Sequence, residues 1–169
     1  MSFSFTQWKT GTSANAYEFF GCHPDGQDTV FRVWAPGAEN LYVTGSFCGW
    51  DPCRYPMQET EPGLFCLTLP GISQYDVYKY VRMTADGQPV FKSDPFAFHA
   101  ETAPANASKV YAMGNHAWGD GKWMSRRSPD GPLNLYQLHA GAFRTYAGGE
   151  PLNYCKLGEE LASYLKKLG

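Results

Sequence analysis

The segment Asp76–Met83 constrains the fold more than any other part of this sequence. Its residues, Asp-Val-Tyr-Lys-Tyr-Val-Arg-Met, send alternate side chains to opposite faces, as the residues of a half-buried β-strand do. Asp86-Gly87 follows it, a dipeptide typical of a tight hairpin turn, and Val90–Lys92 then returns along the first strand. The sequence therefore predicts an antiparallel sheet built from local hairpins.

Further short segments repeat this alternation and end at turn residues such as Pro36-Gly37 and Pro70-Gly71. We expect them to be strands at Val30–Ala35, Leu41–Ser46 and Leu64–Leu69, with Lys109–Met113 as a closing edge strand. Short strands at regular spacing favour a small immunoglobulin-like β-sandwich, here over residues 30–113. Residues 1–29 are punctuated by glycine and proline, and we expect them to form an irregular N-terminal arm.

The character of the sequence changes after residue 132. Leu133–His139 is an apolar segment with the length of a strand, and Leu157–Gly169 places leucines at helical spacing, with lysines in its last turn. A strand followed by a helix is half of a parallel β-α-β unit, which needs a second strand beside the first. We therefore expect residues 133–169 to open a larger α/β domain; a C-terminal helix packed on the sandwich is the alternative. Residues 114–132 contain Trp118 and Trp123, so we expect a linker packed on a partner surface.

Composition excludes several classes of function. The net charge of −2 leaves no basic patch for nucleic acid or for an anionic membrane. No apolar stretch reaches the length of a membrane span, and the N-terminus lacks the pattern of a secretory signal. The five cysteines are odd in number and lack C-x-x-C spacing, which indicates free thiols in a reducing cytoplasm. The four histidines are scattered, so no metal site is expected.

Two residues are candidates for function on their position alone. Trp50 follows Gly45 and Gly49 at the end of a predicted strand; it either caps the core or forms a solvent-facing ligand platform. His139 ends the predicted parallel strand, where α/β barrels place their sites, although a structural histidine remains the alternative. No phosphate-binding loop or other cofactor motif is present.

Glycoside chemistry needs two carboxylates across one bond. The acidic residues lie mainly in predicted turns, where solubility and turn geometry explain them (Asp51, Asp76, Asp86 and Asp94). We expect no catalytic pair within this chain.

Several motifs, taken in order, closely resemble the N-terminal region of bacterial glycogen branching enzymes, which belong to the α-amylase superfamily. These motifs are Tyr17–Pro24, Phe31–Pro36, Val43–Trp50, Tyr78–Tyr80, Lys92–Ala97, Trp123-Met124 and Leu135–Arg144. The resemblance implies a carbohydrate-binding module of family 48 followed by the first strand and helix of an incomplete TIM-type barrel. It also implies that the catalytic residues of the transfer from α-1,4 to α-1,6 linkage lie on later barrel strands, so the chain alone is expected to be inactive.

The resemblance further implies residues that contact α-glucan, as glycogen or maltooligosaccharide. Trp50 would stack on a glucose ring, and Lys79 would donate hydrogen bonds to hydroxyls. The second stacking tryptophan of such modules follows a turn like Asp86–Gln88, but here Pro89 comes next. Phe91 could take that role only with a shifted alignment. The sugar-binding asparagine of such modules is replaced around Ser108. The remainder of the barrel is the expected second partner. The alternatives are a stand-alone glucan-binding or docking module and an immunoglobulin-like interaction domain without a sugar site.

Overall fold

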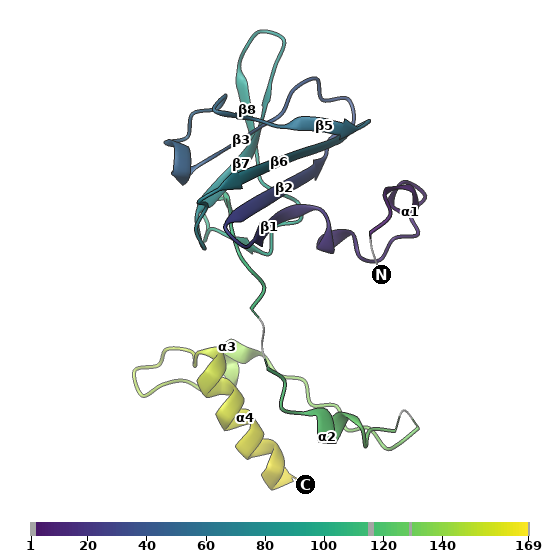
Figure 1. Cartoon of the computed structure of the whole chain (residues 1–169). Helices are drawn as coiled ribbons and strands as arrows, with labels where there is room; N and C mark the ends of the chain where they lie inside the picture. Colours follow the sequence, from purple (N-terminus) through teal and green to yellow (C-terminus); the bar gives the residue numbers. More distant parts are fainter. Residues whose placement is uncertain (1–2, 115–116, 129, 169) are drawn as a thin grey trace. The chain divides into compact units, whose positions relative to one another are not determined.

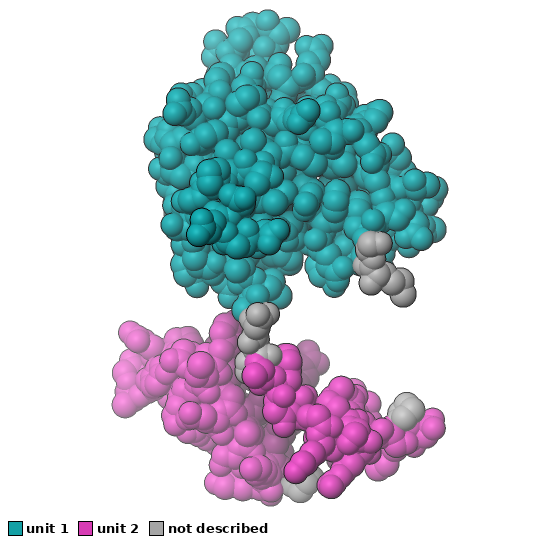
Figure 2. Space-filling view, viewed as in Figure 1, with its two compact units in different colours: residues 1–116 teal, residues 117–169 magenta. Residues whose placement is uncertain are grey.

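The structure, a computed structural model, describes residues 3–114, 117–128 and 130–168. The chain divides into two compact units, residues 1–116 and residues 117–169 (Figure 2). The boundaries expected at residues 29, 113 and 132 stay predictions.

Within the described residues, the first unit is a sandwich of two antiparallel sheets, as expected (Figure 1). The four-stranded sheet has the order β1 (Gly21–Asp25), β2 (Asp28–Trp34), β6 (Leu64–Pro70), β5 (Gln58–Glu61). The six-stranded sheet has the order β4 (Tyr55–Pro56), β3 (Tyr42–Gly45), β7 (Val77–Met83), β10 (Ser108–Lys109), β9 (His99–Ala100), with β8 (Pro89–Lys92) also paired to β7. Three short helices accompany the strands: α1 (Phe5–Lys9), η1 (Ala16–Glu18) and η2 (Ser46–Cys48).

The predicted hairpin is confirmed, and it joins β7 to β8. Gly87 takes the left-handed conformation with φ +77°, and the Thr84 N–H donates to the Gln88 carbonyl oxygen at 2.9 Å. The prediction of a closing edge strand at Lys109–Met113 is wrong. β10 spans two residues and pairs with β7 on one side and with β9 on the other, so β9 forms the edge. A strand this short carries too few alternations to be located from sequence.

The core lies between the two sheets because alternate side chains of each strand point inward. Phe31 on β2 faces Tyr78 on β7 with ring centroids 5.2 Å apart, and both side chains are fully buried. Val43 and Tyr80, which are cross-strand partners, complete the same layer. Full burial of each such side chain contributes roughly 1.5–3 kcal/mol to folding. This layer fixes which face of β3 and β7 remains outside.

The N-terminal arm packs on the outer face of the four-stranded sheet. Phe20 is fully buried there with Leu64, and Phe3 stacks on Phe19 with centroids 4.1 Å apart. The arm is less irregular than expected, because its end forms β1 against β2. Pro24 obscures β1 in the sequence, but a proline is tolerated on an edge strand, where one side needs no N–H donor.

Asp94 begins a turn, as expected, since its carbonyl oxygen accepts the Ala97 N–H at 3.3 Å, but solubility does not explain it. Its side chain is buried, and its Oδ2 accepts hydrogen bonds from the Tyr78 hydroxyl at 2.6 Å and from the Tyr80 hydroxyl at 3.2 Å. Its Oδ1 accepts from the Phe96 N–H at 2.8 Å. Desolvation raises the pKa of Asp94 and of both tyrosines, and burial raises the pKa of nearby Cys22 to about 12. This carboxyl group is therefore part of the core.

The second unit contains α2 (Gly121–Met124), α3 (Ala140–Phe143) and α4 (Tyr154–Leu168). The predicted C-terminal helix is confirmed as α4, whose Tyr164 ring contacts Tyr136 and Phe143 at centroid distances of 5.6 Å. The structure differs from the prediction of a strand over Leu133–His139, because these residues belong to neither helix nor strand. A strand exists only where a neighbour pairs with it, and no described residue of this unit pairs there.

Trp118 and Trp123 are both largely exposed, at 77% and 62%. Their packing against a partner surface stays a prediction. Across the described parts of both units, no helix combines the length and the apolar character needed to cross a membrane.

Candidate glucan-binding face

The outer face of the six-stranded sheet carries two of the residues singled out in the sequence. Opposite residues of paired strands point to the same side. Lys79 pairs with Thr44 on β3, and Val81 pairs with Phe91 on β8. Since Tyr78 and Tyr80 point into the core, Lys79 and Phe91 share the opposite, outer face.

The segment that follows β3 folds back over this outer face. The Cys48 thiol lies 3.4 Å from the Thr44 hydroxyl, and the Cys53 thiol lies 4.0 Å from the Met83 sulfur on β7. Thr44 and Val81 are fully buried although they lie on the outer face, and the contact with Cys48 shows that this segment covers Thr44. Trp50 is placed between those two contacts, so it too lies over the outer face.

The backbone around Trp50 is held in an unusual conformation. Trp50 has φ +64°, and its N–H donates to the Gly45 carbonyl oxygen at 3.1 Å. A bulky residue with positive φ costs roughly 1–2 kcal/mol, and such strain tends to occur at functional sites. Gly45 is required for a different reason: a Cβ there would lie 2.1 Å from the Val77 carbonyl oxygen.

For Trp50, the sequence alone allows both a core residue and a ligand platform. Its side chain is 39% exposed, and among the described residues its ring stacks on no other ring. Phe91 is 42% exposed and likewise makes no ring contact within the described chain. Both rings therefore present free apolar surface, Phe91 on the same face as Lys79 and Trp50 on the segment that folds back over that face.

Lys79 is oriented by a residue that sequence reasoning missed. Its ammonium group donates to the side-chain oxygen of Asn106, an exposed residue just before β10. The Ser93 hydroxyl donates to the Asn106 carbonyl oxygen and restrains that loop. The Asn106 amide NH₂ thus stays beside the Lys79 ammonium as a second donor.

The replacement of a sugar-binding asparagine around Ser108 stays a prediction, but the Ser108 side chain does not lie on the outer face. Ser108 is 1% exposed, and its hydroxyl accepts the Asp94 N–H at 2.8 Å, so it faces the interior. Asn106 lies two residues earlier, where its side chain reaches Lys79. Only a register for β10 would have identified it, and β10 is too short to reveal one from its alternation.

His139 lies elsewhere, in the second unit, and is exposed. Its carbonyl oxygen accepts the N–H groups of Ala142 and Phe143, both at 3.0 Å, so the residue precedes the first turn of α3. The structure brings none of Trp50, Lys79 and Phe91 into the same unit as His139. Its assignment to a barrel site stays a prediction.

Other acidic residues of the first unit serve turns. The Asp51 carboxylate accepts the Cys53 N–H at 3.0 Å, and Asp76 accepts the Ser46 hydroxyl at 2.8 Å. A hydrogen bond from Thr84 lowers the pKa of Asp86. In the described part of the chain, no three His, Cys, Asp or Glu side chains are grouped as a metal site would need.

Comparison with known families finds a match for most of the first unit. Residues 19–97 match the model of carbohydrate-binding module 48, described as the isoamylase N-terminal domain. That region includes both sheets' principal strands and the residues Trp50, Lys79 and Phe91.

The chain is also similar to the N-terminal portion of larger proteins. It is 37% identical to the 1,4-alpha-glucan branching enzyme GlgB of Rhodospirillum rubrum and 39% identical to that of Rubrobacter xylanophilus, in both cases over 94% of its own length. It spans 23% of the length of each of these relatives. Among solved structures, a putative alpha amylase from Salmonella typhimurium aligns with 62% of this chain and 17% of that chain, at 25% identity and a TM-score of 0.49.

Proposed function

Because the chain carries a carbohydrate-binding module of family 48 and is related along nearly its whole length to the N-terminal portion of 1,4-α-glucan branching enzymes, we propose that its first unit binds α-glucan. The site is the outer sheet face with Trp50, Lys79 and Asn106. The observation that supports this most directly is the exposed Trp50 ring, held at positive φ on the face where Lys79 and Asn106 present their donors.

The chemistry of this face suits a sugar. The pyranose ring of glucose has an apolar C–H face that stacks on an aromatic ring, while its hydroxyls need hydrogen-bond partners. The Trp50 indole supplies the first contact, and the Lys79 ammonium and the Asn106 amide supply the second. Phe91 extends the apolar surface on the same face. No charge is needed on the ligand, consistent with a neutral glucan.

Glycogen should retard the protein in native affinity electrophoresis, and Trp50→Ala should weaken that retardation. Loss of the stacked ring removes about 2 kcal/mol of binding free energy, or roughly a 30-fold rise in Kd. Trp50→Gly is the matched control, because glycine accepts positive φ without strain and so removes the ring while preserving the fold. Lys79→Met should also bind more weakly, since it keeps the aliphatic stem and loses the donor. Mobility of both Trp50 variants equal to that of the wild type would contradict the proposal.

We also propose that the whole protein to which this region belongs is a glycogen branching enzyme, in which the module holds the glucan that the catalytic part rearranges. The relatives' names and the module family support this. The present chain supplies no paired catalytic carboxylates by the sequence argument, so purified protein should leave the iodine-stained spectrum of amylose unchanged. A shift of that spectrum would show catalysis by this chain and would refute that expectation.

A further inference from the structure

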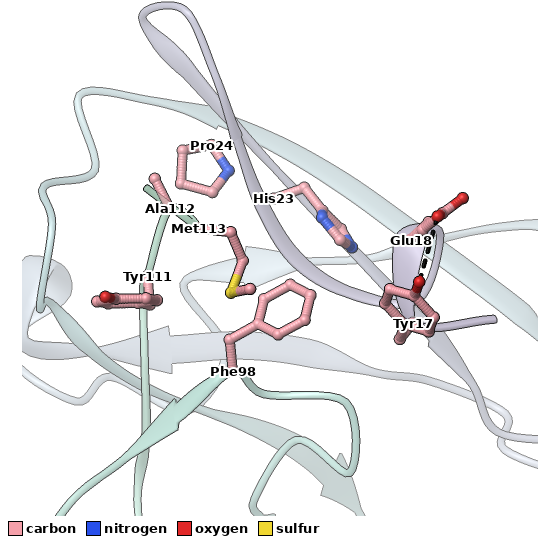
Figure 3. A pocket seen from close by; sticks show the side chains of 8 residues that line it. All are labelled: Tyr17, Glu18, His23, Pro24, Phe98, Tyr111, Ala112 and Met113. Atoms are coloured by element: carbon pink, nitrogen blue, oxygen red, sulfur yellow. Dashed lines mark hydrogen bonds between the residues drawn. The ribbon is translucent and has the colours of Figure 1, made fainter. Parts of the chain in front are cut away.

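The first unit also contains a pocket, away from the outer sheet face with Trp50, Lys79 and Asn106, which we call the Trp50 face. It has a volume of about 430 Å³, within the usual range for ligand pockets. We call it the aromatic pocket (Figure 3), and its walls include Tyr17, Glu18, His23, Phe98, Tyr111 and Met113. These residues come from four separate segments: η1, β1, the chain before β9 and the chain after β10.

The aromatic pocket occupies an open side of the sandwich. It lies where β1, an edge of the four-stranded sheet, approaches the chain around β9, an edge of the six-stranded sheet. β9 is separated from β3 by β7 and β10, so it lies roughly 14 Å from β3 at the usual strand spacing. The pocket and the Trp50 face are therefore distinct sites on one module.

Aromatic rings line the pocket in a row. Phe98 appears between Tyr111 and Tyr17 in Figure 3, and the His23 ring meets Phe98 edge-on with centroids 5.9 Å apart. The Tyr111 ring also contacts the Tyr75 ring, with centroids 5.9 Å apart. The Tyr111 side is thus a small platform of packed rings rather than a single exposed residue.

The backbone at Tyr75 repeats the unusual feature of the Trp50 face. Among the described residues, Tyr75 (φ +70°) and Trp50 (φ +64°) are the two non-glycine residues with positive φ. Both are exposed aromatic residues, Tyr75 at 55%. The fold thus tolerates backbone strain at two places, and at each place the strained residue holds a ring beside a candidate sugar-binding surface.

Polar atoms on the pocket wall match the hydroxyls of a sugar. The His23 Nε2 lies 2.8 Å from the Phe20 carbonyl oxygen and must donate to it, which leaves Nδ1 as an acceptor in the neutral ring. Glu18 has no cationic partner among the described residues; its oxygens accept from Asn15 at 3.2 Å and from the Tyr17 hydroxyl at 3.4 Å. Apolar ring faces interspersed with acceptors fit a ligand whose surface alternates C–H faces and O–H groups.

We propose that the aromatic pocket is a second α-glucan contact, which acts together with the Trp50 face on branched glucans. The proposal rests on the glucan-binding function proposed above. Two contacts on one module make the second binding event effectively intramolecular when the ligand offers many chain ends. A glycogen particle should then bind far more tightly than a short maltooligosaccharide. The difference in affinity should exceed the difference expected for a module with a single site.

The test is an NMR titration of the full chain with maltoheptaose, combined with glycogen affinity electrophoresis. We expect the backbone amides of His23, Phe98 and Tyr111 to shift along with the Trp50 indole. Tyr111→Leu combined with Phe98→Ala should abolish the first set of shifts, keep the Trp50 shift and weaken glycogen binding about tenfold. Trp50→Gly should keep the shifts of the pocket amides and remove the indole signal.

Two further variants separate binding from folding. Tyr75→Gly relieves the positive φ and removes the supporting ring, so it should weaken glycogen binding without loss of thermal stability. Tyr154→Ala removes an 85% exposed ring of the second unit and should bind glycogen as the wild type does.

The outcomes distinguish this proposal from the one on which it rests. If maltoheptaose shifts Trp50 but leaves the pocket amides unmoved, the Trp50 face stands and the pocket proposal is overturned; a pocket that instead receives a protein segment gives this result. If maltoheptaose moves neither set, both proposals fail. Shifts in both sets that respond independently to the two groups of variants support two contacts.

Discussion

Asp94→Ala is expected to lower the free energy of unfolding of the first unit by about 3–5 kcal/mol. The substitution leaves the buried hydroxyls of Tyr78 and Tyr80 without their acceptor and the Phe96 N–H without its partner. Each buried donor that loses its partner costs about 1–3 kcal/mol, and the vacated volume adds to this. Thermal unfolding followed by circular dichroism should show a fall in Tm of about 12–20 °C.

One milder variant and one double mutant test whether the hydrogen bonds cause the loss. Tyr78→Phe removes one donor together with its need for an acceptor, so it should cost only about 1 kcal/mol. Combined with Asp94→Ala it should cost less than the sum of the two single changes, because the shared interaction is lost only once. Additive effects in this double-mutant cycle would show that Asp94 does not stabilise the fold through Tyr78.

The raised pKa of Asp94 also predicts a pH dependence of stability. Desolvation raises the folded-state pKa above the unfolded value, so the folded protein binds the proton more tightly. This contribution to stability is fully present below the unfolded pKa and is lost as pH rises through the folded pKa. Asp94→Asn cannot titrate, so the difference in unfolding free energy between wild type and Asp94→Asn should shift against the wild type over that window. A pH-independent difference would contradict the assignment.

The sandwich could be predicted because each main strand shows the alternation of a half-buried strand within its own sequence. β2, β6 and β7 each span seven residues, long enough for alternation to show, and Asp86-Gly87 fixes the hairpin from β7 to β8. The two-residue strands β4, β9 and β10 lack that signal and are defined by pairing across the sheet. This pairing joins residues that are distant in the sequence, so a reading of local patterns does not locate these three strands.

The residues of the candidate site also differ in whether the local sequence or the strand pairing reveals them. Trp50 and Lys79 stand in recognisable local patterns, whereas Asn106 becomes visible only when β10 brings its loop beside Lys79. Asp94 shows the converse. Its sequence neighbourhood, Ser93-Asp94-Pro95, is typical of a turn, and only the packing of β7 above it reveals two tyrosine hydroxyls directed at one carboxyl group.

The amide hydrogens of α4 are expected to exchange about a thousandfold faster than those of β7. β7 lies inside a sheet and pairs on both edges, so its amides should exchange only when the first unit unfolds. α4 has 15 residues, and a helix of this length is marginal in water without tertiary packing. A difference of about 4 kcal/mol in opening free energy corresponds to that ratio.

The packing of α4 within its own unit explains why little protection is expected. Leu157 is its one buried residue among those described, and Leu165 and Leu168 remain 39% and 58% exposed. The contacts of Tyr164 with Tyr136 and Phe143, and the exposed ion pair of Arg144 with Glu160, support its middle. Tyr164→Ala should therefore speed exchange over residues 161–168 further and leave β7 unchanged. Exchange across those residues as slow as in β7 would show that the apolar face of α4 is covered, for example by a second copy of the chain, and would contradict the prediction.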